Sequence, residues 1–404
     1  MPHVPFHLYF ILLFLLIVGG QVLMYLLASR FLSGKGVGKK FIKTYLPIIF
    51  VVINTPLFLT RIDPDLFYYP GFVRTFIMMP FFAYQTMSLA VVLTTVVVYI
   101  VRIVLRIWKR SVKESAGEIS PDPILKSRRS FIRKGAVGLG AYAFVGSLHS
   151  IYDRGDYKID RVTITLKNLP AKLDGLTISM ISDIHSGLYM LEDDMLKYAD
   201  AVNQLKADMI FIPGDFVTSK NNEVLPLAKA FSGLKSKYGT YACLGNHDFF
   251  ANPAYITEKL REHGMNVLRN ETDELEIEGV RLMLSGVDDG RHANFPKVSY
   301  EADSLDTTRI LLCHKPYYLE NAVAGGFDLM LSGHTHGGQI VFLDLFGEKI
   351  TPAALVSPYV SGKYRMGKTH MYVSRGIGTV GLPIRVNCPP EVTLFTLRSE
   401  SKHR

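Results

Sequence analysis

Hydrophobic and polar positions divide the chain into two parts with different patterns, which meet near residue 150. Before that point, residues 4–29, 44–60 and 75–101 are almost free of charge. As a helix, each stretch is about long enough to span the ~30 Å hydrocarbon layer of a bilayer. We therefore expect about three transmembrane helices within residues 1–107.

A fourth apolar segment follows at residues 135–152, rich in small residues and only mildly apolar. It fits either a fourth membrane crossing or a helix that lies against the following domain, and both interpretations stay open. We assign residues 135–155 to this segment and its linker, and residues 156–404 to a separate domain.

From residue 158 onwards, short apolar runs alternate with amphipathic segments. In residues 192–206, apolar side chains recur at helical spacing, at Met195, Ala199, Val202 and Leu205. The later half adds short strand-like runs with short connections, at residues 274–278, 281–285 and 370–374. The pattern predicts an α/β domain in which two sheets lie face to face, with helices outside them.

Charge is divided as sharply as hydropathy. Lys and Arg outnumber Asp and Glu by 17 to 5 in residues 1–150, whereas residues 151–404 carry 28 against 31, and the differences of +12 and −3 add to the net charge of +9. The basic balance therefore gives no support to nucleic-acid binding by the later domain. Basic residues gather at residues 30–43 and 109–134, which the positive-inside rule places in the cytoplasm. With four crossings, the later domain falls on the extracytoplasmic side of the cell membrane.

Residues 108–134 form the second basic loop, and its last part contains Arg128 and Arg129 just before the small-residue segment. This arrangement is similar to a twin-arginine export signal. A plain positive flank is the alternative, because such signals normally begin a chain. Both interpretations give the same topology.

Five of the apolar runs end on short polar turns that carry His, Asp or Asn. Run 178–182 is followed by Asp183-Ile184-His185, run 209–213 by Gly214-Asp215, and run 241–244 by Gly245-Asn246-His247-Asp248. Run 310–313 is followed by His314, and run 329–332 by Gly333-His334-Thr335-His336. Such runs are typical of buried parallel strands, and in open α/β sheets ligands collect beyond the carboxyl ends of strands. A lone His or a Gly-Asp pair is more often structural, but five such turns together predict one site assembled from five loops.

The residue types in these turns favour metal binding. Imidazoles, carboxylates and one carboxamide, without cysteine, suit Mn, Fe or Zn. Within Asp183/His185 and His334/His336 the two residues are two positions apart, so on an extended backbone both side chains face the same way and can close on one ion. A carboxylate shared by two divalent ions would hold them roughly 3.5–4 Å apart, the spacing that clamps a phosphoryl group and ionises a water. The turns therefore predict a two-metal hydrolase for an anionic phosphate ester.

The order of these motifs resembles that of the calcineurin-like metallophosphoesterases, over roughly residues 158–397. Residues 337–340, 374–378, 383–385 and 389–391 resemble one branch, the membrane-associated bacterial phosphodiesterases, which often carry twin-arginine signals. The resemblance implies a four-layer αββα sandwich, a hydrolase acting on phosphoric ester bonds, and two divalent metal ions as cofactors.

The resemblance also implies a role for each site residue. Asp183, His185 and His336 would bind the first metal, Asp215 would bridge both metals, and Asn246, His314 and His334 would bind the second. His247 would protonate the leaving oxygen or stabilise its charge, with Asp248 as a candidate orienting partner. Many relatives carry an Asp three residues after the bridging carboxylate, where this chain has Thr218, which puts that contact in question but not the metal site.

For function, we expect metal-dependent hydrolysis of a phosphodiester or pyrophosphate at the outer face of the membrane, with a monoester left open. The alternative is a non-catalytic membrane sensor or binding protein that retains the fold. Arg375, Arg385 and Asn387 are candidate substrate contacts, because an Arg fork pairs with phosphate oxygens, although each is equally suited to a structural role. Several membrane spans fit a lipid or lipid-linked substrate confined to the bilayer surface, and they fit equally a role in export, stability or binding of a protein partner.

Overall fold

The computed structural model of the chain describes residues 6–62, 71–113, 156–187, 189–296, 307–345, 348–381 and 383–400. The chain divides into two compact units, Met1–Tyr152 and Asp153–Arg404. Arg128, Arg129 and the fourth membrane segment expected at residues 135–155 lie outside the described residues. The finer division of the first unit into spans, basic loop and linker therefore stays a prediction.

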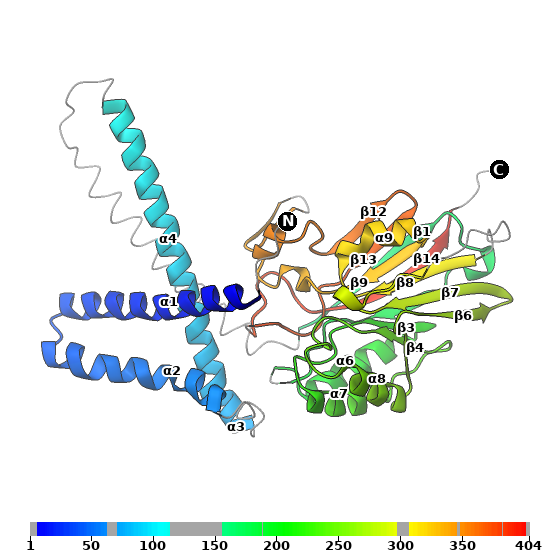
Figure 1. Ribbon diagram of the computed structural model, residues 1–404, viewed down its shortest axis with the longest axis horizontal. Coiled ribbons are helices and arrows are strands. Elements are labelled where there is room, and N and C mark those ends of the chain that lie inside the picture. The colour runs from blue at the N-terminus through cyan, green and yellow to red at the C-terminus, as the bar shows by residue number, and fades with distance from the viewer. Residues whose placement is uncertain are drawn as a thin grey trace. The chain divides into compact units, whose positions relative to one another are not determined.

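Helices make up the first unit where it is described. They are α1 (Phe6–Gly34), α2 (Leu46–Ile62), α3 (Gly71–Val73) and α4 (Met79–Lys113), and the π-helical turns η1 (Phe41–Tyr45) and η3 (Arg74–Met78) lead into α2 and α4. Helix α1 contacts both α2 and α4 (Figure 1). Among the described residues, no helix combines the length and the apolar character needed to cross a membrane, so the structure does not support the transmembrane helices expected within residues 1–107.

A network of polar side chains connects the three long helices of this unit. Gln21 of α1 donates to Gln85 and Ser88 of α4, over 2.8 and 3.3 Å. It accepts from Asn54 of α2, over 3.2 Å, and from Tyr84 of α4. Gln85 in turn donates to Asn54 over 2.9 Å. Because these groups satisfy one another, the network favours one alignment of the three helices over others.

Two mixed sheets, each of six strands among the residues described, form the second unit. The first contains, in order across the sheet, β1 (Lys158–Leu166), β14 (Glu391–Ser399), β2 (Thr177–Met180), β3 (Met209–Pro213), β4 (Thr240–Cys243) and β5 (Met265–Val267). The second contains β12 (Gly362–Met366), β13 (Thr369–Val373), β9 (Leu329–Ser332), β8 (Thr307–Cys313), β7 (Val280–Val287) and β6 (Glu271–Ile277). The five apolar runs that precede the polar turns correspond to β2, β3, β4, β8 and β9, so the prediction that they form strands is confirmed.

Strand direction explains why the polar turns meet. Strands β2, β3, β4 and β5 run parallel in the first sheet, and β7, β8, β9 and β13 run parallel in the second. Antiparallel pairing occurs where β14 joins β2 and where the outer strands β12 and β6 join their neighbours. Since parallel strands end at the same edge of a sheet, the turns after β2, β3 and β4 share one edge, and those after β8 and β9 share another.

The two sheets lie face to face, because side chains along each strand alternate between two cores. In β3, Met209 and Phe211 are buried between the sheets, together with Leu312 of β8. The intervening Ile210 and Ile212 are buried against α6 (Glu192–Gln204), α7 (Val224–Phe231) and α8 (Pro253–Glu262). On the far side of the second sheet, buried residues of β8 pack against α9 (Leu319–Ala324).

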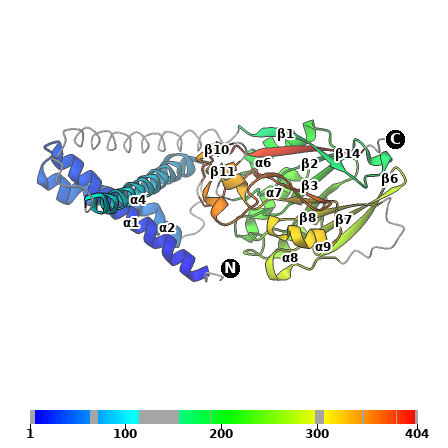
Figure 2. The same cartoon turned by 90° about the horizontal axis from the view of Figure 1, so that it is seen from above.

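The layers are therefore helices, sheet, sheet and helix, as Figure 1 shows. In the view from above, the paired strands β1 and β14 lie side by side (Figure 2). The α/β class and the two facing sheets expected from the sequence are confirmed. A small hairpin of β10 (Leu343–Leu345) and β11 (Glu348–Ile350), which the sequence pattern did not indicate, follows the turn after β9.

Candidate metal centre

Turns from both sheets bring the predicted ligands together at one place in the second unit. Asp183 and His185 follow β2, Asp215 follows β3, Asn246 follows β4, His314 follows β8, and His334 and His336 follow β9. Most of these side chains are buried, whereas Asn246, His247 and His334 are partly exposed. These three residues therefore form the side of the site that solvent reaches.

The backbone of these turns differs from the extended form expected from the sequence. Asp183 and His185 have φ angles of 51° and 50°, and Asp215, His334 and His336 have φ angles of 57°, 75° and 52°. This left-handed conformation is uncommon outside glycine and concentrates at functional sites. Asp183 and His185 still converge, but His334 and His336 separate into different clusters, so the argument that each pair closes on one ion is wrong for the second pair.

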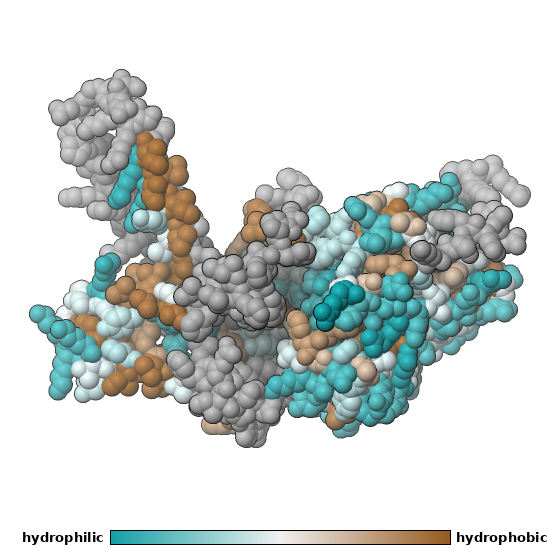
Figure 3. All heavy atoms as spheres, viewed as in Figure 1, coloured by the Kyte–Doolittle hydropathy of each residue, from teal (hydrophilic) through white to brown (hydrophobic). Residues whose placement is uncertain are grey.

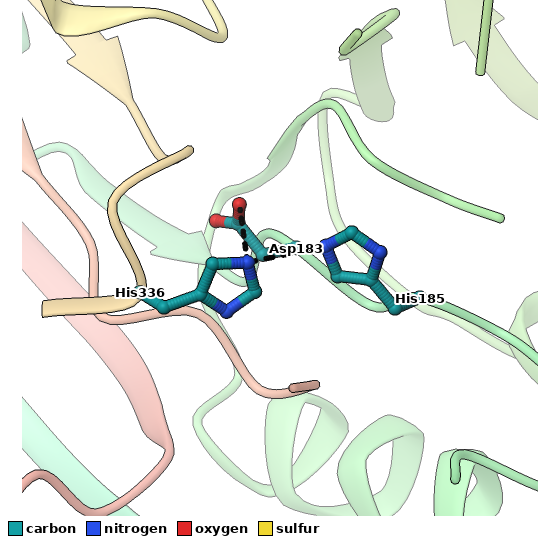
Figure 4. Close-up of side chains that lie close together, drawn as sticks. All are labelled: Asp183, His185 and His336. Carbon is teal, nitrogen blue, oxygen red and sulfur yellow. Dashed lines mark hydrogen bonds and ion pairs between the residues drawn. The ribbon is translucent and has the colours of Figure 1, made fainter. Parts of the chain in front are cut away.

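The first cluster contains Asp183, His185 and His336 (Figure 4). The Nε2 atoms of the two imidazoles are 3.2 Å apart, and His336 Nε2 lies 3.6 Å from Asp183 Oδ1. The Nδ1 atoms of both His185 and His336 are buried and find no hydrogen-bond partner among the described residues. Two buried imidazoles facing each other beside a carboxylate are the arrangement of ligands around a cation.

The second cluster contains Asp215, His314 and His334. Asp215 Oδ2 lies 3.1 Å from His314 Nε2, and the same oxygen lies 3.4 Å from His185 Nε2 of the first cluster. Asn246 contributes a further oxygen, since its Oδ1 is buried without a hydrogen-bond partner among the described residues. Asp215 is thus the carboxylate that lies between the two clusters.

The charge state of these groups suits metal binding. Burial lowers the pKa of His185 to about 3 and holds the pKa values of His334 and His336 well below their usual range. Although burial acts in the opposite direction, the neighbouring His314 holds the pKa of Asp215 well below its usual value. Neutral imidazoles and ionised carboxylates are the forms that bind divalent metals. Against the effect of burial, Asp215 raises the pKa of His314 to about 10, so this imidazole must release a proton when a metal binds. The nitrogen and oxygen donors, without sulfur, and the buried atoms that lack partners fit two divalent ions.

Further contacts hold the two central carboxylates in place. Asp183 accepts hydrogen bonds from Ser182 Oγ over 2.6 Å and from the His334 N–H over 2.8 Å. Asp215 accepts from the His247 N–H over 2.8 Å. Such contacts orient a ligand before the metal arrives. Apart from their position beside the ligands, the sequence gives no signal for these contacts.

Two glycines in the polar turns are required by close approach to the carboxylates. A Cβ atom at Gly245 would lie 2.3 Å from Asp215 Oδ1, and one at Gly333 would lie 2.2 Å from Asp183 Oδ2. Both distances are far below van der Waals contact, so any larger residue would displace a ligand. The motif glycines that precede Asn246 and His334 therefore belong to the site.

His247 lies beside both clusters, but its surroundings differ from those of the ligands. Its ring meets that of His185 edge to face, with centroids 4.6 Å apart. Its Nδ1 atom lies 2.7 Å from the backbone carbonyl oxygen of Thr218, so Nδ1–H donates to that carbonyl and Nε2 is the nitrogen available to a substrate. Thr218 thus supplies through its main chain an orienting contact at the position where many relatives carry Asp.

Asp248 does not orient the His247 ring, and that expectation is wrong. Its buried carboxylate instead accepts hydrogen bonds from four backbone N–H groups, at distances of 2.8 to 3.1 Å. The donors are Asp215, Phe216, Val217 and Gly245. Asp248 therefore ties the turn after β3 to the turn after β4.

The three candidate substrate contacts are occupied by protein groups. Arg375 pairs with Asp160 over 2.8 Å and with Glu391 over 3.2 Å. Arg385 is partly buried and donates to main-chain carbonyls, including those of residues 375, 376 and 388. Asn387 donates to the carbonyl of residue 341 over 3.0 Å. The structural interpretation, which the sequence had left open for each of them, fits these contacts.

Comparison with known proteins places the chain among metallophosphoesterases. The family model described as Calcineurin-like phosphoesterase matches residues 176–338. The uncharacterized metallophosphoesterase YkuE of Bacillus subtilis is 32% identical over 287 residues, which cover 68% of this chain and 98% of YkuE. An uncharacterized metallophosphoesterase of Aquifex aeolicus is 32% identical over 277 residues, covering 66% of this chain and 98% of that protein.

A vertebrate relative has a different name. The "Transmembrane protein with metallophosphoesterase domain" of Danio rerio is 30% identical over 256 residues, which cover 60% of this chain and 57% of that protein.

The fold and the two clusters define a metal-dependent hydrolase of phosphoester bonds. The chain belongs to the calcineurin-like phosphoesterase family, whose members use a dimetal centre.

Proposed function

We propose that the chain hydrolyses a phosphodiester or a pyrophosphate at a dimetal centre whose ligands are those assigned above. The observation that carries the proposal is the position of Asp215, with one oxygen 3.4 Å from His185 of the first cluster and 3.1 Å from His314 of the second. A single carboxylate between two sets of imidazoles is suited to bridging two cations.

The division of roles follows from the geometry. Asp183, His185 and His336 would hold one ion, Asn246, His314 and His334 the other, and Asp215 both. When bound, the two ions supply Lewis-acid polarisation of the phosphoryl oxygens and an acidified water. His247, held through Nδ1 by the Thr218 carbonyl, presents Nε2 for proton transfer to the leaving oxygen.

We also propose that residues 1–155 attach the chain to a membrane. The excess of basic residues in the first unit supports this proposal, and so does an apolar face of α4 that exposes Val96, Ile100, Val104 and Ile107 by 47, 53, 57 and 62% (brown in Figure 3). The name of the Danio rerio relative agrees with it. We further propose that these residues cross the membrane with their basic loops in the cytoplasm, which would place the hydrolase outside the cytoplasm. Arg128 and Arg129 would then form the export signal. The substrate would be a lipid-linked phosphodiester at the bilayer surface.

The experiment that tests the hydrolase proposal replaces the bridging ligand. In Asp215→Asn, a neutral amide cannot hold two cations together, so bound metal should fall and activity should drop by at least ~100-fold. Metal content is measured by plasma mass spectrometry on protein purified without chelator, and activity on a panel of phosphomonoesters, phosphodiesters and pyrophosphates. Asp200→Asn, an exposed carboxylate on α6, is the matched control and should change neither quantity. A variant at Asp215 that keeps two metals and normal turnover would refute the assignment.

A further inference from the structure

Phe250 lies on the solvent side of the site, directly beside His247. The centroids of the two rings are 4.9 Å apart and their planes meet at 67°. The Phe250 N–H donates to the His247 carbonyl over 3.0 Å, so a tight turn holds the two residues together. The Phe250 side chain is nevertheless 54% exposed. A large apolar surface is therefore presented at the open side of a polar site.

The preceding residue provides a contrast within the same turn. Phe249 stacks on His292, with centroids 4.9 Å apart and planes at 11°, and the guanidinium carbon of Arg269 lies 5.8 Å from its ring centroid. Phe249 also packs against the core beneath the outer helices. Its role is structural, whereas the exposed surface of Phe250 faces away from that core.

The orientation of His247 determines which part of a substrate meets Phe250. Because Nδ1 donates to Thr218, only Nε2 can deliver a proton to the leaving oxygen. In that step a water oxygen bonds to phosphorus and the water releases one proton to solvent. The bond from phosphorus to the leaving oxygen breaks, and the Nε2 proton passes to that oxygen. The group attached to the leaving oxygen must then lie next to the His247 ring, where Phe250 is in contact.

We propose that Phe250 is a specificity-determining residue that forms an apolar wall for the leaving group. The favoured substrates then carry an aromatic ring or an alkyl chain on the leaving oxygen. This inference rests on the proposed function, with His247 as the proton donor. An apolar leaving group that covers the exposed half of the Phe250 ring removes apolar surface from water. This burial should raise kcat/KM roughly tenfold over that of a substrate with a small leaving group.

The test uses the full-length protein with bound metal and a series of methyl para-alkylphenyl phosphates, from para-methyl to para-hexyl. Lengthening the alkyl chain adds apolar surface while the basicity of the phenolate leaving group stays nearly constant. In the wild type, kcat/KM should rise with chain length. Phe250→Ala should abolish most of that rise, with a loss of about tenfold on the para-hexyl ester and little on the para-methyl ester. Phe250→Leu, which keeps an apolar side chain, should retain most of it.

Two controls make the result specific. Leu196→Ala removes an apolar side chain that is 42% exposed on α6 and should leave the whole series unchanged. Binding of methyl para-alkylbenzylphosphonates, in which a methylene replaces the scissile oxygen, is measured by calorimetry. Their affinity should follow the same dependence on chain length and on Phe250, and a thermal melt of each variant should confirm that it is folded.

The outcomes separate this inference from the proposed function. A wild type that hydrolyses every ester at the same efficiency, whatever the chain length, overturns the role of Phe250 and leaves the hydrolase proposal intact. An equal loss on all esters in Phe250→Ala, with unchanged phosphonate affinity, also overturns it, because Phe250 would then only position His247. A metal-loaded wild type that hydrolyses none of the esters counts against the proposed function, and phosphonate affinity then decides the role of Phe250.

Discussion

Two buried carboxylates that stand on adjacent turns, Asp215 and Asp248, have different hydrogen-bond partners. Asp215 accepts one backbone hydrogen bond, and its other oxygen faces the imidazoles of His185 and His314. Asp248 accepts four backbone hydrogen bonds through its two oxygens. A carboxylate whose oxygens are filled by N–H groups is poorly suited to bind a metal, and one that faces imidazoles is well suited. The partners therefore assign one residue to the metals and the other to the backbone.

His247 gives a prediction at the residue scale. His247→Ala should keep the metals and slow hydrolysis by roughly 10²–10⁴, because the proton donor to the leaving oxygen is lost. The loss should be smaller on nitrophenyl esters, whose leaving group needs little protonation. Steady-state kinetics on an alkyl ester and a nitrophenyl ester, together with metal analysis, measure both effects.

The control for this substitution is His263→Ala, at the end of α8, where Nδ1 of the ring hydrogen-bonds to the carbonyl of residue 259 over 2.8 Å. It should leave both activities unchanged. Equal losses on the two esters would assign His247 to substrate positioning, and loss of metal would make it a ligand, since it lies close enough to His185 and Asp215 to complete a third cluster.

Asp248 acts at the scale of elements, because it connects the turns after β3 and β4. Asp248→Asn keeps the side-chain size but replaces one acceptor oxygen by a donor that faces two N–H groups. With about 1–3 kcal/mol for each buried donor left without a partner, the free energy of unfolding should fall by about 2–4 kcal/mol. Urea unfolding followed by near-ultraviolet circular dichroism measures this change.

Asp200→Asn, on the exposed face of α6, is the comparison for Asp248→Asn and should leave the midpoint of unfolding unchanged. Metal affinity should also decrease in Asp248→Asn, because Asp215 and Asn246 belong to the two turns that it connects. An unchanged midpoint would show that the four hydrogen bonds contribute little to stability.

At the same scale, the strands were predictable because each apolar run ends abruptly at a polar turn. The conformation of those turns could not be predicted, because the left-handed φ angles at Asp183 and His336 depend on the tertiary contacts around them. The sequence also could not predict the hydrogen-bond and ion-pair partners of Arg375, Arg385 and Asn387. Arg375 pairs with Asp160, which lies 215 positions away along the chain. The hydrogen bond from His247 to the Thr218 carbonyl could not be predicted either, because a backbone group has no sequence signature.

At the scale of the whole molecule, the chain combines a basic helical unit with a slightly acidic hydrolase unit. The charge differences of +12 and −3 show that the basic character does not serve the catalytic unit. The second unit has its own cores, one between the sheets and one under the helices on each side, so we expect it to fold without the first. What the first unit adds is therefore open to a direct test.

The last prediction compares the full chain with a chain that begins at Asp153, on a soluble methyl nitrophenyl phosphate and on a phospholipid in vesicles. Both proteins should hydrolyse the soluble ester with similar kcat/KM, because all the proposed ligands lie after residue 153. On vesicles the shortened chain should be at least ~10-fold slower, since it loses the apolar and basic surface that would hold it at the bilayer. Co-sedimentation with the vesicles measures attachment independently of turnover. If the two proteins sediment alike and hydrolyse the phospholipid alike, residues 1–152 do not direct the enzyme to a membrane substrate.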